Sequence, residues 1–108
     1  MRVALHTTLL SGQEEAYEAA HATVPGELAN SLRACGVREW SIWRSGRHLF
    51  HLIECDDFSR ALAVLEHDPA NVRWQVAMSS FVVGPPDGSR GADVDEMRAV
   101  WSLSDQGN

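Results

Sequence analysis

Apolar and polar side chains alternate along four stretches of this chain, a pattern typical of strands with two different faces. The stretches span residues 2–9, 37–44, 48–55 and 96–103. Residues 45–47, Ser-Gly-Arg, separate the second stretch from the third, which predicts a hairpin.

Apolar residues recur at spacings of three and four after the first strand, which predicts a helix. A capping box of Ser11 and Glu14 is expected to start it, Pro25-Gly26 to interrupt it and Gly36 to stop it.

Two shorter helices are predicted after the hairpin. Asp56-Asp57 is expected to cap the first, and Asp68-Pro69 to end it and start the second, which runs through Met78. Residues 84–93 are rich in glycine and proline and predict a loop.

The resulting order is strand, helix, two strands, a broken helix and a final strand. This order is typical of an α+β, ferredoxin-like antiparallel sheet with helices on one face only. Because Trp40, Ile42, His51 and Trp101 lie in the predicted strands, we expect the open face to meet a second subunit or to line a pocket.

The length of 108 residues suits one core, so residues 1–108 are expected to form a single domain. The net charge of −6 and the scatter of nine arginines argue against nucleic acid as a partner. Since lysine is absent, a Schiff-base mechanism is excluded.

No apolar run approaches the roughly 20 residues of a membrane span, and no signal peptide is recognisable, so a cytoplasmic location is expected. Cys35 and Cys55 lack the spacing of a metal site and are interpreted as reduced core thiols.

Tyr17 and His21 are the strongest candidates for chemistry. They stand four residues apart, so a helix places phenol and imidazole on one face. An imidazole exchanges protons near neutral pH, and a phenol can orient a hydroxylated substrate. A packing role for the histidine is the alternative.

Tryptophans supply candidate walls for a site. Trp40 and Trp43 have opposite strand parity, so at most one lines it. Trp74 lies between Arg73 and Gln75. Because adjacent residues of a helix point in different directions, two of these three side chains are expected to converge on one site. An indole offers a flat apolar surface for a sugar or an aromatic ligand, and core filling is the competing interpretation.

Other polar residues carry weaker signals. Glu54 follows an apolar strand and could act as a base or simply face solvent. His6, His48 and His51 could join His21 around a metal, but no zinc spacing is present, and no metal is expected.

Short segments in a characteristic order carry a family resemblance. They are Glu15-Ala16-Tyr17-Glu18-Ala19-Ala20-His21, Glu27-Leu28, Gly36-Val37-Arg38-Glu39-Trp40-Ser41-Ile42-Trp43, Leu49-Phe50, Glu54, Arg73-Trp74 and Val100-Trp101-Ser102-Leu103. The chain resembles the L-rhamnose mutarotase family over nearly its whole length, except residues 84–93.

The resemblance implies a dimeric α/β barrel that interconverts sugar anomers without a cofactor. It implies His21 as proton donor and Tyr17, Trp40 and Trp74 as sugar contacts. Gln75 stands where the family usually has a second tryptophan, and we expect it to line the same pocket. Ala22 replaces an asparagine, and Pro25 falls one place earlier than the family's proline.

Mutarotation of a deoxy sugar such as L-rhamnose or L-fucose is therefore the expected activity, because it needs only paired proton transfer. One alternative is a ferredoxin-like, cofactor-independent monooxygenase that acts on an aromatic substrate. The other is a non-catalytic ligand-binding dimer.

Overall fold

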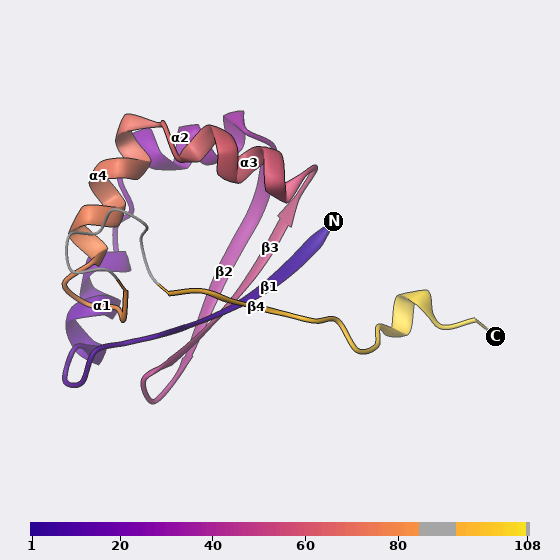
Figure 1. Ribbon diagram of the computed structural model, residues 1–108, viewed down its shortest axis with the longest axis horizontal. Coiled ribbons are helices and arrows are strands. Elements are labelled where there is room, and N and C mark those ends of the chain that lie inside the picture. Colours follow the sequence, from indigo (N-terminus) through magenta and orange to yellow (C-terminus); the bar gives the residue numbers. More distant parts are fainter. Residues whose placement is uncertain (85–92, 108) are drawn as a thin grey trace.

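The computed structural model of the protein describes residues 1–84 and 93–107, which fold around a four-stranded antiparallel sheet (Figure 1). The strands are β1 (Arg2–Thr8), β2 (Val37–Ser45), β3 (His48–Cys55) and β4 (Asp95–Met97). Their order across the sheet, β2-β3-β1-β4, confirms the predicted ferredoxin-like topology, including the hairpin.

Four helices arch over one face of the sheet (Figure 1). They are α1 (Glu14–His21), α2 (Gly26–Ala34), α3 (Phe58–Leu65) and α4 (Pro69–Met78). None of the helices in the described part of the chain is long and apolar enough to cross a membrane.

Local chemistry sets most helix ends as predicted. Asp57 caps α3 by accepting the Arg60 amide at 3.1 Å, and Asp68 caps α4 by accepting the Asn71 amide at 2.9 Å. Gly36 follows α2 with φ of +92°, a conformation that favours glycine.

The predicted capping box is wrong. Gln13 occupies the cap position of α1, and no side chain caps the helix. Ser11 and Gly12 form a turn instead, with Gly12 at φ of +81°, so Glu14 is the first helical residue and not the third.

Strand parity decides which side chains face the helices. His51 pairs with Leu5 and Ile42, and Trp40 pairs with Ile53, so all of these lie on the covered face. The open face, which we expected to meet a second subunit or to line a pocket, therefore does not carry Trp40, Ile42 or His51. Trp43 lies on the open face, at 56% exposure.

The core consists of two clusters along the sheet. The first cluster contains Val3, Leu5, Val37, Ile53, Cys55, Phe58 and Ala61, and Trp40 packs against it. The second contains Leu9, Tyr17, Leu49, Met78 and Val82, and Ile42 and Trp74 pack against it. Two tryptophans thus face the interior from different clusters.

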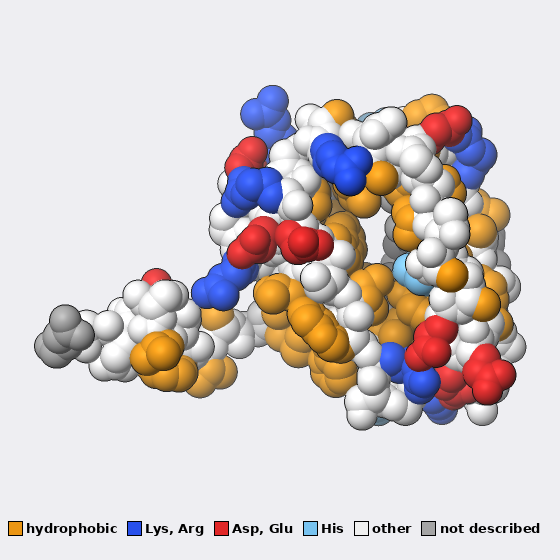
Figure 2. Space-filling model, turned by 180° about the vertical axis from the view of Figure 1, so that it is seen from behind, with side chains coloured by type: hydrophobic (Ala, Val, Ile, Leu, Met, Phe, Trp, Pro, Cys, Tyr) orange, Lys and Arg blue, Asp and Glu red, His pale blue; other side chains and the backbone are white. Residues whose placement is uncertain are grey.

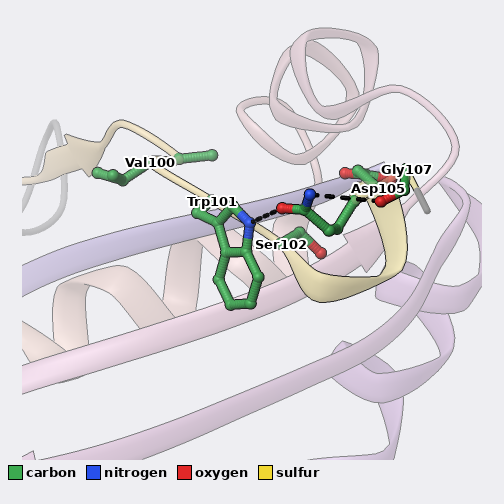
Figure 3. Close-up of a pocket in the computed structure, with 7 residues that line it drawn as sticks. Val100, Trp101, Ser102, Asp105 and Gly107 are labelled. Atoms are coloured by element: carbon green, nitrogen blue, oxygen red, sulfur yellow. Dashed lines mark hydrogen bonds between the residues drawn. The ribbon is translucent and has the colours of Figure 1, made fainter.

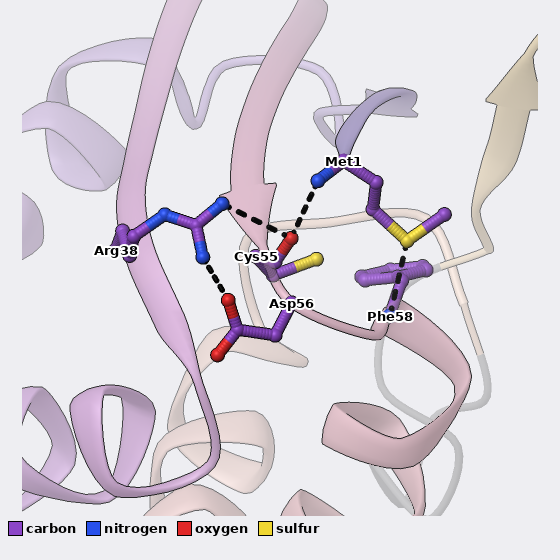
Figure 4. A network of polar contacts seen from close by, with 5 residues as sticks. All are labelled: Met1, Arg38, Cys55, Asp56 and Phe58. Atoms are coloured by element: carbon purple, nitrogen blue, oxygen red, sulfur yellow. Dashed lines mark hydrogen bonds and ion pairs between the residues drawn. The ribbon is translucent and has the colours of Figure 1, made fainter.

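Polar contacts fasten the start of β1 to the end of β3 (Figure 4). The Met1 amino group donates to the Cys55 carbonyl oxygen at 2.7 Å, and Arg38 donates to the same oxygen at 3.3 Å. Arg38 also forms an ion pair with Asp56. Because both partners are exposed, this pair contributes little stability, and the backbone contacts fix the sheet end.

The last predicted strand is much shorter than expected. β4 ends at Met97, which pairs with Ala4, and continuing that register would place Val100 opposite Met1. Since β1 begins at Arg2, the chain runs out of strand to pair with. Residues 98–107 instead form an arm that extends away from the sheet (Figure 1).

The arm contains one short 3-10 helix, Leu103–Asp105. Arg2 donates to the Ser102 hydroxyl at 3.2 Å and links the arm to the start of β1. The predicted loop, residues 84–93, lies almost wholly outside the described residues. Cys35 and Cys55 are free thiols, as predicted.

Candidate active site

His21 ends α1 with its ring packed against Tyr17, and the two ring centroids are 4.1 Å apart with the planes tilted by 36°. Its Nδ1 lies 3.0 Å from the Tyr17 backbone oxygen. Because a carbonyl oxygen only accepts, Nδ1 must carry a hydrogen and donate it. In the neutral ring, Nε2 therefore holds the free lone pair, and it has no hydrogen-bond partner within the described residues.

Trp74 brings α4 to the same imidazole. Its ring meets His21 edge-on, with centroids 5.1 Å apart and planes at 82°. His21 is thus held between a phenol from its own helix and an indole from another. The sequence spacing predicted the first contact, and the fold adds the second.

Tyr17 is almost fully buried, and burial raises the pKa of its phenol to about 12. Its hydroxyl stays protonated at physiological pH and can both donate and accept a hydrogen bond. No other described side chain bonds to this hydroxyl, so it is available to a ligand.

Trp40, on β2, donates its indole N–H to His51 Nδ1 at 3.1 Å, and His51 Nε2 lies 3.0 Å from the Thr7 hydroxyl. From the sequence, His51 was expected to be a strand residue and a possible metal ligand, but not a partner of Trp40. Its parity with the apolar residues Leu49 and Ile53 was the available sign that it points inward.

The pKa of His51 is lowered to about 4, first by burial and then by the charges of His21 and His6. His51 is therefore neutral at physiological pH.

The other predicted polar residues lie elsewhere. Gln75, partly buried, donates to Asn71 at 3.4 Å on α4, and no described contact joins it to His21. Arg73 forms an exposed ion pair with Glu27 at 2.7 Å. Glu54 lies on the open face, opposite in parity to His51.

No group of three or more potential metal ligands occurs in residues 1–84 and 93–107. His6 and His48 bond to each other at 2.9 Å on the open face, away from His21 and His51.

The molecule is hollowed between the sheet and the helices, with hydrophobic side chains and a histidine in the wall (Figure 2). We call this space the interior cavity; Tyr17, His21, Trp40, His51 and Trp74 come from the elements around it. A separate hollow lies in the arm, where Trp101 donates to Gln106 at 2.8 Å (Figure 3). The second hollow contains no histidine.

The fold and the site define a class of protein: a ferredoxin-like α+β protein in which one imidazole lies between two aromatic rings and is available for proton transfer. A family model described as L-rhamnose mutarotase matches residues 2–103. An L-rhamnose mutarotase of Opitutus terrae is 33% identical over 89 residues, covering 81% of this chain and 85% of that protein. The chain belongs to the L-rhamnose mutarotase family and is an isomerase.

Solved structures agree with the fold. The L-rhamnose mutarotase of Formosa agariphila superposes with a TM-score of 0.81 at 24% identity, covering 95% of this chain and 98% of that one. A proposed antibiotic biosynthesis monooxygenase of Nitrosomonas europaea reaches 0.60 at 14% identity, covering 94% and 100%. The shared architecture therefore does not separate these two activities.

Proposed function

We propose that this protein interconverts the α and β anomers of a deoxy sugar such as L-rhamnose or L-fucose, with His21 as the proton donor. The observation that carries the proposal is the fixed orientation of His21. Its Nδ1 is committed to the Tyr17 carbonyl oxygen, so Nε2 is the atom left to exchange a proton with a ligand.

The reaction begins with a charged His21 giving its Nε2 proton to the ring oxygen of the sugar. The anomeric hydroxyl loses its proton to a water or a neighbouring sugar hydroxyl, and the bond between the anomeric carbon and the ring oxygen breaks. An open-chain aldehyde results. After rotation, the freed hydroxyl attacks the other face of the aldehyde, its proton returns to His21, and the aldehyde oxygen regains a proton.

Aromatic groups hold the sugar in this scheme. The Tyr17 hydroxyl is available for a hydrogen bond, and Trp40 and Trp74 supply apolar surfaces for the C–H faces and methyl group of a deoxy sugar. Gln75 is proposed as a further contact, through the amide N–H and oxygen that its hydrogen bond to Asn71 does not use. No cofactor is needed, since proton transfer is the whole reaction.

A second copy of the chain is the proposed partner. Trp43 and Phe50 are exposed side by side on the open face, where they pair across β2 and β3. Val100, Trp101 and Leu103 on the arm are exposed as well, at 97%, 66% and 72%. A homodimer would cover both apolar surfaces.

The dimer is tested by sedimentation at several concentrations. Replacing Trp43 with Asp should produce monomers, because a carboxylate on a buried apolar face is unpaired. A monomeric wild-type protein at micromolar concentration would refute the dimer. The cytoplasmic location, consistent with free thiols at Cys35 and Cys55, stays a prediction.

Saturation-transfer NMR tests the activity. One anomeric proton of an equilibrated sugar is saturated, and transfer to the other anomer is measured with and without protein. We expect faster exchange for L-rhamnose or L-fucose. If no sugar in a panel of aldoses exchanges faster, the mutarotase proposal fails, and oxygen uptake with an aromatic polyketide would then establish the monooxygenase alternative.

A further inference from the structure

Three neighbouring strands contribute side chains to one hydrogen-bonded chain on the helix-covered face of the sheet. Trp40 on β2 donates from Nε1 to His51 Nδ1 on β3, and His51 Nε2 contacts the Thr7 hydroxyl on β1. Thr7 is only 4% exposed, so the chain ends in the protein interior. We refer to these three residues as the indole clamp.

The donors and acceptors in the indole clamp are fixed by their chemistry. An indole N–H can only donate, so His51 Nδ1 must accept. In a neutral imidazole the hydrogen then sits on Nε2, which donates to the Thr7 oxygen. Both ring nitrogens of His51 therefore have a hydrogen-bond partner. Protonation of Nδ1 would point its new N–H at the indole N–H of Trp40, and the hydrogen bond between them would be lost.

The two imidazoles of the cavity consequently differ in what they can do. His21 has one nitrogen bonded to backbone and one without a described partner, whereas His51 has neither free. Burial, and to a smaller degree the charges of His21 on α1 and of His6 on the opposite face of β1, lower the pKa of His51 and keep its ring neutral. His51 therefore cannot serve as the second proton-transfer group.

We propose that His51 is a positioning residue that fixes Trp40 by accepting its indole N–H, so that Trp40 presents apolar ring surface and no hydrogen-bond donor to the ligand. This inference rests on the proposed sugar site. An apolar platform binds substrate and transition state about equally, so loosening it should raise KM and leave kcat nearly unchanged.

The test compares two replacements of His51. His51→Leu keeps bulk but removes the acceptor, whereas the amide oxygen of His51→Asn can still receive the indole N–H. The Leu variant should raise KM about tenfold with kcat within about twofold, and the Asn variant should recover most of that loss. Equal KM values for wild type and Leu variant would overturn the proposal, as would a loss confined to kcat.

The indole N–H itself gives a readout that needs no activity. In a proton–nitrogen NMR spectrum, the Trp40 signal is assigned by its absence in Trp40→Phe. We expect it to be protected from solvent exchange in the wild type and the Asn variant, and to exchange at least tenfold faster in the Leu variant. Fast exchange in the wild type would refute the clamp, whether or not any sugar is turned over.

The wild-type signal also keeps the test decisive if the Leu variant fails to fold. The Trp40 indole shift should stay constant between pH 8 and pH 6, and it should move only as His51 titrates near its lowered pKa of about 4. A change centred near pH 6.5, the ordinary value for histidine, would mean that Nδ1 is free to take a proton. A failed mutarotase assay beside a protected indole would reject the function but keep the clamp.

Discussion

Acid should destabilise this protein partly through His51, and the effect can be isolated with one substitution. His51 has its pKa lowered from 6.5 to about 4, mainly because the ring is buried. As pH falls, the unfolded chain binds a proton on this ring before the folded chain does. The stability from the neutral ring is thus complete above about pH 6.5 and is lost as pH falls towards 4.

The size of the effect follows from the change in pKa. Each pKa unit corresponds to about 1.4 kcal/mol, so a drop from 6.5 to about 4 corresponds to about 3 kcal/mol. Between these pH values, His51 should contribute a slope of nearly one proton, or about 1.4 kcal/mol per pH unit. Carboxylates elsewhere add their own dependence, so only a difference between variants isolates the ring.

His51→Asn provides that difference, because it keeps a hydrogen-bond acceptor for Trp40 and removes the titrating group. Urea unfolding is followed by fluorescence at pH 7, 6, 5 and 4, at one protein concentration so that any dimer contributes equally. The stability of wild type relative to the variant should fall by about 3 kcal/mol from pH 7 to pH 4. Parallel pH curves for the two proteins would show that protonation of His51 does not destabilise the fold.

Four further substitutions test the fold and the site. Gly36→Ala should cost about 1–2 kcal/mol in urea unfolding, because φ is +92° and the added Cβ would lie 3.0 Å from Asp56 Oδ2; an unchanged midpoint would contradict this. Asp68→Ala should cost more than Asp57→Ala, each about 1–2 kcal/mol, because Asp68 also accepts the Ser31 hydroxyl at 2.9 Å; equal losses would count against that bond. Tyr17→Phe should fold normally and lower kcat/KM about tenfold if the hydroxyl binds sugar; full activity would remove Tyr17 from the site.

Local signals in the sequence predicted most of the fold. Asp57, Asp68 and Gly36 act through atoms within a few residues of themselves, so their roles can be inferred without the rest of the structure. Strand parity likewise predicted that Trp40 and Trp43 lie on opposite faces of the sheet, and the exposure of Trp43 confirms this.

Predictions that depended on distant partners were less successful. Residues 98–103 alternate like a strand, but β1 offers them too few partners, and alternation alone cannot reveal a missing neighbour. The inward position of His51 depends on its pairing with Leu5 and on its bonds to Trp40 and Thr7, and these partners are distant in the sequence. The Tyr17–His21 pair was predictable because a helix alone brings the two rings together.

We propose that the Nε2 atom of His21 moves the proton that opens the sugar ring. Exchange between the anomers of L-rhamnose should be measured for wild type, His21→Ala and the matched control His67→Ala, whose histidine is exposed in the turn after α3. We expect wild-type rates for His67→Ala and a loss of about a hundred- to ten-thousand-fold for a folded His21→Ala. Full acceleration by a folded His21→Ala protein would contradict this proposal.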